Sequence, residues 1–327
     1  MTGVMIMSPM SSIQLPDPTS WGGALLLSDL GIIQAEGADA ANFLHGQFSQ
    51  DVNGQPADEA RLAAYCSAKG RMLASLLNLR PQPEQFWLLT DAQVLPGLLK
   101  RLSMFVLRAK AKLTDASDAL SVVGLLGAPA AVSLGEAAQV GAWHVQAHGQ
   151  GLLVGLPEVL GAQRWYWVGA KAEAQALVSS LPAVEHGAWA WLEVMSGIPH
   201  IQASTVDQFV PQMVNYELIG GVNFKKGCYP GQEVVARSQY RGTTKRRAFV
   251  VHAEQALSPG QEVFSMVDPG QPAGLVINCA CVGGVHSALV ELKLSAIDTD
   301  LRAGAADGVK LLVGKLPYPL PSAEEAA

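Results

Sequence analysis

The spacing of apolar residues predicts alternating helices and strands over the first three quarters of the chain. Between residues 43 and 52 apolar residues recur at three- and four-residue intervals, which indicates a helix, and Asn53-Gly54 ends it. Two apolar runs separated by Lys69-Gly70 predict a β-hairpin over residues 61–79. Further strands are predicted at 86–90, 120–126, 151–156 and 164–170, and helices at 94–106, 171–181 and 189–195.

The pattern changes after Lys245. Helical periodicity disappears, and short apolar runs alternate with Gly, Pro and Asp turns, which predicts a small C-terminal β-barrel or sandwich. The fold class is therefore α+β, with mixed or antiparallel sheets and helices on one face. The expected C-terminal strands are 248–253, 273–282, 286–294 and 310–316.

Composition narrows the class of protein. A chain of 327 residues fits two or three domains, and 49% hydrophobic with 15% charged residues indicates a folded protein. The net charge of −6 argues against general coating of nucleic acid. Despite a mean hydropathy of +0.22, two long uncharged stretches, 119–135 and 270–290, are interrupted by Gly, Pro and polar residues and predict buried strands with turns. No membrane contact is expected.

The basic residues and the cysteines give expectations for the location of the protein and the state of its thiols. The first Lys or Arg is Arg61, so no basic leader segment is recognised and a cytoplasmic location is expected. Four cysteines are too few for a disulfide framework, which predicts free thiols or ligands. Cys279 and Cys281 face one side of a predicted strand, but two thiols make a metal site only if other ligands converge. We expect small barrel residues there and no metal.

Positive charge is concentrated between Lys225 and Arg247. This segment has seven basic residues and one acidic residue, which leaves the rest of the chain at −12. Such a segment attracts an anion or forms a solvated basic surface. Within it, Pro230 suits the first position of a helix, so Cys228 is expected near a positive helix end. Cys228 is then either a reactive thiol with increased thiolate character or a small buried residue beneath a turn.

The run KGCYPGQE, residues 226–233, closely resembles the signature of the YgfZ family, folate-binding relatives of the T-protein, the aminomethyltransferase of the glycine cleavage system. Most of the chain shares the resemblance, with landmarks in family order. These are FLHGQFSQDV (43–52), YCSAKGRML (65–73), WLEVMSGIP (191–199), FVPQMVNYELIGGVNFKKGCYPGQEVVAR (209–237) and LPYPL (316–320).

The resemblance implies a T-protein-like cloverleaf of three domains. Its first α+β domain, which contains a central channel, comprises residues 20–115 with part of 190–240. A second, ferredoxin-like α+β domain comprises 116–190, and a C-terminal β-barrel 241–320. Residues 1–19 and 321–327 are expected to be flexible termini.

The resemblance also implies a function. The channel is expected to bind tetrahydrofolate or another reduced folate, and the protein to support iron–sulphur enzymes and tRNA modification by methylthiolation. Its functional partners are then iron–sulphur or tRNA-modifying enzymes, with a weak tRNA contact. Whether the protein is itself an enzyme is left open.

Carried over by position, Cys228 is the functional thiol, and Lys226 holds it as thiolate or binds an anion. Trp189 is expected to line the folate pocket, where a flat indole suits stacking on a pterin. The remaining predicted binding residues are Tyr229, Gln232, Glu233 and Arg237.

Two positions depart from the family pattern. Leu30 stands where the family often has a tryptophan, and Met195 stands where it has a glutamate that pairs with the pterin. Methionine accepts no such bidentate hydrogen bond. Glu193 is expected to replace that glutamate only if the helix turned, because residues two apart face different directions.

Two other functions are weighed. An aminomethyltransferase resembling the T-protein requires an acidic residue after the first hairpin, where this chain has Ala74 and Ser75, so this function ranks below the accessory role. A tRNA-binding module using segment 225–247 would show an affinity that falls steeply with salt. Its basic residues would be Arg237, Arg241, Lys245, Arg246 and Arg247.

Overall fold

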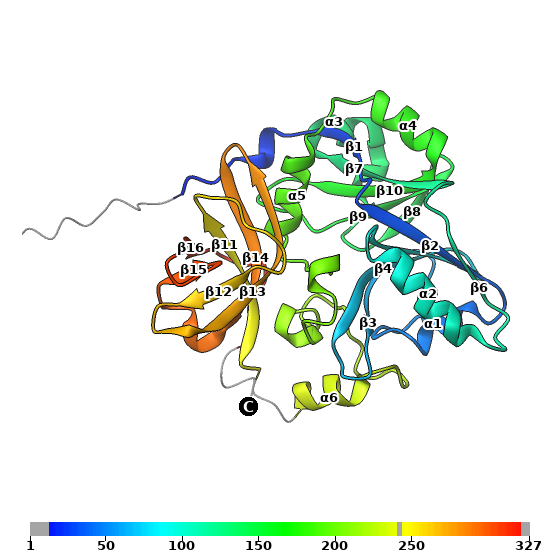
Figure 1. The fold of residues 1–327 in the computed structure, drawn as a ribbon. Helices are drawn as coiled ribbons and strands as arrows, with labels where there is room; N and C mark the ends of the chain where they lie inside the picture. The colour runs from blue at the N-terminus through cyan, green and yellow to red at the C-terminus, as the bar shows by residue number, and fades with distance from the viewer. Residues whose placement is uncertain (1–12, 241–243, 322–327) are drawn as a thin grey trace, which may run out of the picture.

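Two five-stranded sheets and a closed β-barrel form the architecture of the computed structural model, which describes residues 13–240 and 244–321 (Figure 1). All pairings between the named strands are antiparallel. The α+β class predicted from the sequence is therefore confirmed.

The first sheet has the strand order β3-β4-β5-β2-β6. Alternate residues of its strands face two cores, as the two-residue period of a strand requires. Ala74 and Leu76 face the helices α1 and α2, whereas Leu77 and Leu79 face the centre of the molecule. The elements are β2 (Leu30–Glu36), α1 (Ala40–His45), β3 (Arg61–Cys66), β4 (Met72–Gln82), β5 (Gln85–Asp91), α2 (Leu95–Val106) and β6 (Lys112–Asp115).

The second sheet has the order β1-β7-β10-β9-β8, and α3 and α4 cover its outer face. The sequence assigned residues 20–29 to the first domain, but β1 pairs with β7 in this second sheet, a long-range contact that no local pattern reveals. The elements are β1 (Gly23–Leu26), β7 (Leu120–Leu126), α3 (Gly127–Leu134), η2 (Gly135–Gln139), β8 (Val145–His148), β9 (Gly151–Gly155), β10 (Arg164–Ala170) and α4 (Lys171–Ser179).

Helix α3 corrects the prediction of strands and turns for residues 119–135. Gly127 has a φ of +63°, which ends the strand β7, and the alanine-rich residues that follow favour a helix. Pro129 lies in the first helical turn, where its missing N–H costs nothing.

The C-terminal unit is a closed barrel of order β11-β14-β13-β12-β15-β16, and the pairing of β11 with β16 completes it. This pairing selects the barrel over the sandwich. Its elements are β11 (Arg246–Ala253), β12 (Glu262–Ser265), β13 (Asp268–Val282), β14 (Val285–Lys293), η5 (Leu294–Ala296), β15 (Leu301–Ala303) and β16 (Val309–Val313).

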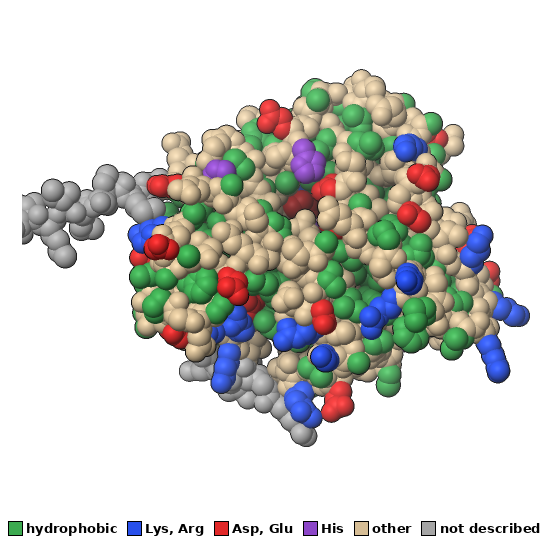
Figure 2. All heavy atoms as spheres, in the orientation of Figure 1, with side chains coloured by type: hydrophobic (Ala, Val, Ile, Leu, Met, Phe, Trp, Pro, Cys, Tyr) green, Lys and Arg blue, Asp and Glu red, His purple; other side chains and the backbone are tan. Residues whose placement is uncertain are grey.

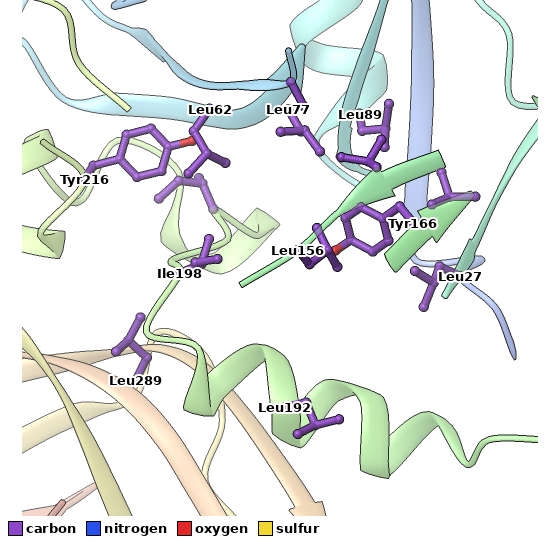
Figure 3. Packing of buried hydrophobic residues seen from close by; sticks show 14 of the residues in the cluster. Leu27, Leu62, Leu77, Leu89, Leu156, Tyr166, Leu192, Ile198, Tyr216 and Leu289 are labelled. Atoms are coloured by element: carbon purple, nitrogen blue, oxygen red, sulfur yellow. The ribbon is translucent and has the colours of Figure 1, made fainter. Parts of the chain in front are cut away.

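One apolar cluster joins the three units. Its labelled residues come from both sheets, from the barrel, from α5 (His186–Met195) and from loops such as that of Tyr216, and they surround the centre in Figure 3. The remaining elements are η3 (Ala203–Thr205), η4 (Pro211–Val214) and α6 (Gln232–Tyr240).

The chain ends differ in part from the expected flexible termini. Leu15 packs against the central cluster and Pro18 of η1 (Pro18–Ser20) is buried, so residues 13–19 belong to the fold. Residues 1–12 and 322–327 lie outside the described part. Within residues 13–240 and 244–321, no helix is long and apolar enough to cross a membrane.

Candidate functional site

Two adjoining cavities lie where the sheets, α5 and the barrel meet. The empty space between their walls, counted together with the part open to solvent, is about 480 and 580 Å³. The two cavities share the lining residues Leu30, Tyr166, Glu193 and His200. The wall of the first cavity is largely apolar and includes leucines of β3, β4 and β5. The second is more polar, because Asp29, Asp91, Gln202 and Asn278 contribute to its wall.

Glu193 is the centre of a polar cluster at the junction of the cavities. Its Oε1 accepts hydrogen bonds from Arg164 Nη1 at 2.7 Å and Tyr166 Oη at 3.3 Å, and its Oε2 lies 2.9 Å from His200 Nε2. Burial raises the pKa of Glu193, but Arg164 and His200 outweigh burial and bring the pKa to about 2. Burial alone lowers the pKa of His200, but Glu193, with Asp29 and Asp91, raises it overall. The cluster therefore presents an ionised carboxylate to the cavities.

The faces of α5 explain why Glu193, and not Met195, reaches the cavities. Trp189, Ala190, Glu193 and Val194 line the second cavity, at the spacing of one helix face. Met195 is 5% exposed and packs in the central core without lining either cavity. The helix therefore needs no turn to present Glu193, contrary to the sequence prediction.

Trp189 lies in the wall of the second cavity, and its role in folate binding stays a prediction. Its ring centre is 5.8 Å from that of Tyr166, and the guanidinium of Arg164 lies 5.5 Å from the indole. These neighbours fix the orientation of the ring. Leu30 lines both cavities, so this residue, which is smaller than the tryptophan often found there in the family, lies where the cavities join.

Ser75 lines the first cavity, and its Oγ accepts a hydrogen bond from the N–H of Ile201 at 2.8 Å. Ala74 faces the opposite side of the sheet, in the core beneath α1 and α2. Neither position supplies the carboxylate that an aminomethyltransferase is expected to have there.

The signature segment lies apart from these cavities, since none of residues 226–237 lines either of them. It packs on the tip of the β3–β4 hairpin. Gly231 has a φ of +79°, and a Cβ there would come within 2.4 Å of the Ser67 carbonyl oxygen. Gly70 in the hairpin has a φ of +71°, and its Cβ would lie 2.8 Å from Val234. Only glycines permit this close approach.

Lys226 anchors the signature turn. Its Nζ donates hydrogen bonds to the carbonyl oxygens of Phe48, at 2.6 Å, and of His45, the last residue of α1. A lysine placed there satisfies carbonyls that a helix end leaves unpaired. Burial lowers the pKa of Lys226 to about 8, against the opposing effects of Asp51 and Cys228. The observed hydrogen bonds therefore position the turn, and the predicted effect on the thiol stays a prediction.

The other predicted residues of the signature divide between the turn and the surface. Cys228 is exposed, whereas Tyr229 is 7% exposed and lies beneath the turn. Helix α6 begins at Gln232 and not at Pro230 as predicted, because Gly231 adopts a left-handed conformation between them. Glu233 and Arg237 pair with each other at 3.2 Å on the exposed face of α6.

The basic segment 225–247 is less available to an external anion than its sequence suggested. Arg246 forms a bidentate pair with Glu291, which is 1% exposed, and Arg247 pairs with buried Glu217. Both arginines therefore hold the barrel strand β11. Arg241 lies outside the described residues. Figure 2 shows that other Lys and Arg side chains are distributed over α6 and the adjacent edge of the molecule.

The remaining cysteines have separate surroundings. Cys279 lines the second cavity and donates to the carbonyl of Leu257 at 2.9 Å, while Cys281 is exposed 3.9 Å from His286 Nε2. Burial raises the pKa of Cys66 to about 12. In the part of the chain that the structure describes, no three His, Cys, Asp or Glu residues are grouped to hold a metal ion.

Sequence reasoning missed Arg164, Tyr166 and His200 as site residues. The sequence contained a signal for Arg164, because a single arginine begins the otherwise apolar strand 164–170. The structure shows that its side chain is 0% exposed. Such a buried charge requires a partner. The partner, Glu193, is far away in sequence and could not be assigned from local pattern.

Comparisons with known proteins complete this description. No family model matches the chain. The chain is 30% identical over 244 residues to the tRNA-modifying protein YgfZ of Vibrio vulnificus, covering 74% of this chain and 73% of that protein. It is 33% identical over 242 residues to that of Colwellia psychrerythraea, covering 70% and 71%.

Among solved structures, the glycine cleavage system aminomethyltransferase T from Bartonella henselae superposes with a TM-score of 0.74 at 16% identity, covering 92% of this chain and 87% of that one. This similarity shows a T-protein-like fold and confirms the expected architecture. The extent of identity to the curated relatives shows that the chain belongs to the YgfZ family.

Proposed function

We propose that this protein binds a reduced folate in the two central cavities and supports tRNA modification through the Cys228 thiol. The observation that carries the folate half is the ionised Glu193 carboxylate at the junction of an apolar and a polar cavity. The tRNA half follows from family membership, since the curated relatives are named tRNA-modifying proteins.

The chemistry of the cavities suits this ligand class. A pterin edge donates N–H groups, and a carboxylate has lone-pair capacity beyond the three contacts that Glu193 already makes. The leucine-lined cavity matches an aromatic ring, and the adjoining Trp189 adds an aromatic wall. His200 lines both cavities beside Glu193 and adds a second polar group toward the ligand.

In this proposal the Cys228 thiol acts on the signature turn and not in the central cavities. Cys228 is exposed on a turn that Lys226 anchors, so a macromolecule can reach it without entering the central cavities. Iron–sulphur or tRNA-modifying enzymes are the proposed functional partners. The cytoplasmic location stays a prediction.

Neither alternative function gains an observation in its favour. The Ser75 hydroxyl already holds the backbone of Ile201 and is not a replacement for an acidic proton carrier. For tRNA contact by segment 225–247, the pairing of Arg246 and Arg247 with buried carboxylates removes two of the proposed phosphate-binding groups.

Folate binding is tested by titrating tetrahydrofolate into the purified protein and following tryptophan fluorescence and heat. Wild type should show saturable quenching. Glu193→Gln should weaken binding about tenfold or more, because a hydrogen bond to a charged group contributes roughly 1.5–3 kcal/mol. Glu136→Gln is the matched control, because Glu136 is exposed and lines neither cavity. Absence of saturable binding to wild type would overturn the folate half.

The thiol half is tested in a strain that lacks its own family member, with methylthiolated tRNA nucleosides measured by mass spectrometry. Cys228→Ser should abolish rescue. Cys281→Ser is the matched control, since both thiols are exposed and only one lies in the signature turn. Full rescue by Cys228→Ser would reject the assigned thiol and leave the folate measurement unaffected.

A further inference from the structure

The C-terminal end of α2 carries an exposed apolar tip. Met104, Phe105 and Leu107 are 66%, 49% and 86% exposed, whereas Leu98 and Leu102 of the same helix are buried against the first sheet. Single exposed apolar residues are ordinary, but three large ones within four positions form a patch that is typical of a contact surface.

Positive charge surrounds this tip. From residue 92 to residue 114 the chain contains five basic residues and no acidic one, although the whole chain has a net charge of −6. Among the ion pairs of the described residues, only Lys112 of this set has a partner, Glu36 at 3.6 Å. Figure 2 shows Lys and Arg side chains projecting from the right-hand edge of the molecule, over α2 and β6. The basic residues are Lys100, Arg101, Arg108, Lys110 and Lys112.

The conformation of Leu107 is a separate observation. It follows the last residue of α2 with a φ of 45° and a ψ of −104°, in the region that disfavours a bulky side chain. Glycine or asparagine usually occupies a positive φ at a helix end and adopts it at low cost. A leucine held there and 86% exposed displays an apolar side chain outward, and such outliers concentrate at functional positions.

We propose that this surface, the α2 tip with its surrounding basic residues, binds tRNA. The inference rests on the proposed role in tRNA modification and assigns the contact to a segment other than 225–247. Lys100, Arg108 and Lys110, whose side chains form no ion pair among the described residues, complement a phosphate backbone. Phe105 supplies a ring on which an unstacked base can lie, and Leu107 an apolar side chain that can contact a base face.

The experiment measures fluorescence anisotropy of labelled, unmodified tRNA with the full-length protein at 50 to 200 mM salt. The α2 triple variant Lys100→Gln, Arg108→Gln and Lys110→Gln should lower affinity at least tenfold at 50 mM salt. It should also reduce the slope of log affinity against log salt by about one for each cation removed. The charge-matched control changes three exposed lysines elsewhere, Lys225, Lys245 and Lys315, to Gln and should bind nearly as wild type does.

Leu107→Gly separates binding from folding. Glycine accepts the observed φ without strain, so the free energy of unfolding should stay the same or rise, while tRNA affinity falls several-fold. Three outcomes would overturn the proposal. The two triple variants could weaken binding equally, or wild type could show no binding at 50 mM salt. The protein could also bind anionic phosphatidylglycerol vesicles more strongly than tRNA. If tRNA binding fails while Cys228-dependent rescue persists, the α2 surface is rejected and the proposed function stands.

Discussion

Replacing Glu193 with glutamine removes the counter-charge of Arg164, whose side chain is 0% exposed. The pKa of Glu193 falls from 4.5 to about 2 in the folded protein. At 1.36 kcal/mol per pKa unit this favours the folded state by roughly 3 kcal/mol at neutral pH. Removing one partner of a buried pair typically costs about 3–5 kcal/mol, so we expect Glu193→Gln to lower the free energy of unfolding by about 3 kcal/mol.

The measurement is urea unfolding at pH 7, with a control pair of the same chemistry on the surface. Glu233 and Arg237 are also a Glu–Arg pair, but they lie within one helix and their side chains are 86% and 69% exposed, so Glu233→Gln should cost less than about 1 kcal/mol. The reasoning is refuted if both substitutions cost the same. It is also refuted if Glu193→Gln and Arg164→Met add without coupling in the double variant, because buried partners should couple.

Three further predictions concern the signature turn and the barrel interface. The pKa of Lys226 is about 8 in the folded protein, below its usual 10.5, so the stability of wild type should rise relative to Lys226→Met between pH 8 and 10.5 in urea unfolding. Gly231→Ala should cost more than Gly220→Ala in thermal unfolding, because both glycines have positive φ but only Gly231 has a backbone oxygen 2.4 Å from the added Cβ. Trp191→Phe removes a buried hydrogen bond of 2.9 Å to Ser287 and should cost about 1–3 kcal/mol in urea unfolding; an unchanged midpoint would contradict this.

Local periodicity predicted the helices and the hairpin, whose hydrogen bonds join residues close together in the sequence. The β3–β4 hairpin and the helices α2, α4 and α5 lie where the sequence placed them. The pairing of β1 with β7 and the closure of the barrel by β11 and β16 depend on contacts over long sequence separations, which periodicity does not encode.

The candidate site was predictable in its parts but not in its arrangement. The sequence identified both Trp189 and the exposed Cys228, yet the structure places Trp189 in the central cavity and Cys228 on a separate turn. The choice between Glu193 and Met195 depended on which face of α5 meets the cavities. The internal pairing of Arg246 depended on Glu291, which is 45 positions away.

The β3–β4 hairpin contacts both the first central cavity and the signature turn that carries Cys228. Its strands contribute Leu62, Ser75 and Leu77 to the wall of the first cavity, and its tip holds Gly231 beside Ser67. At about 3.4 Å per residue, the part of β4 from Ser75 to its first residue, Met72, spans roughly 10 Å. One continuous pair of strands therefore connects the wall of the first cavity with the turn on which the signature segment rests.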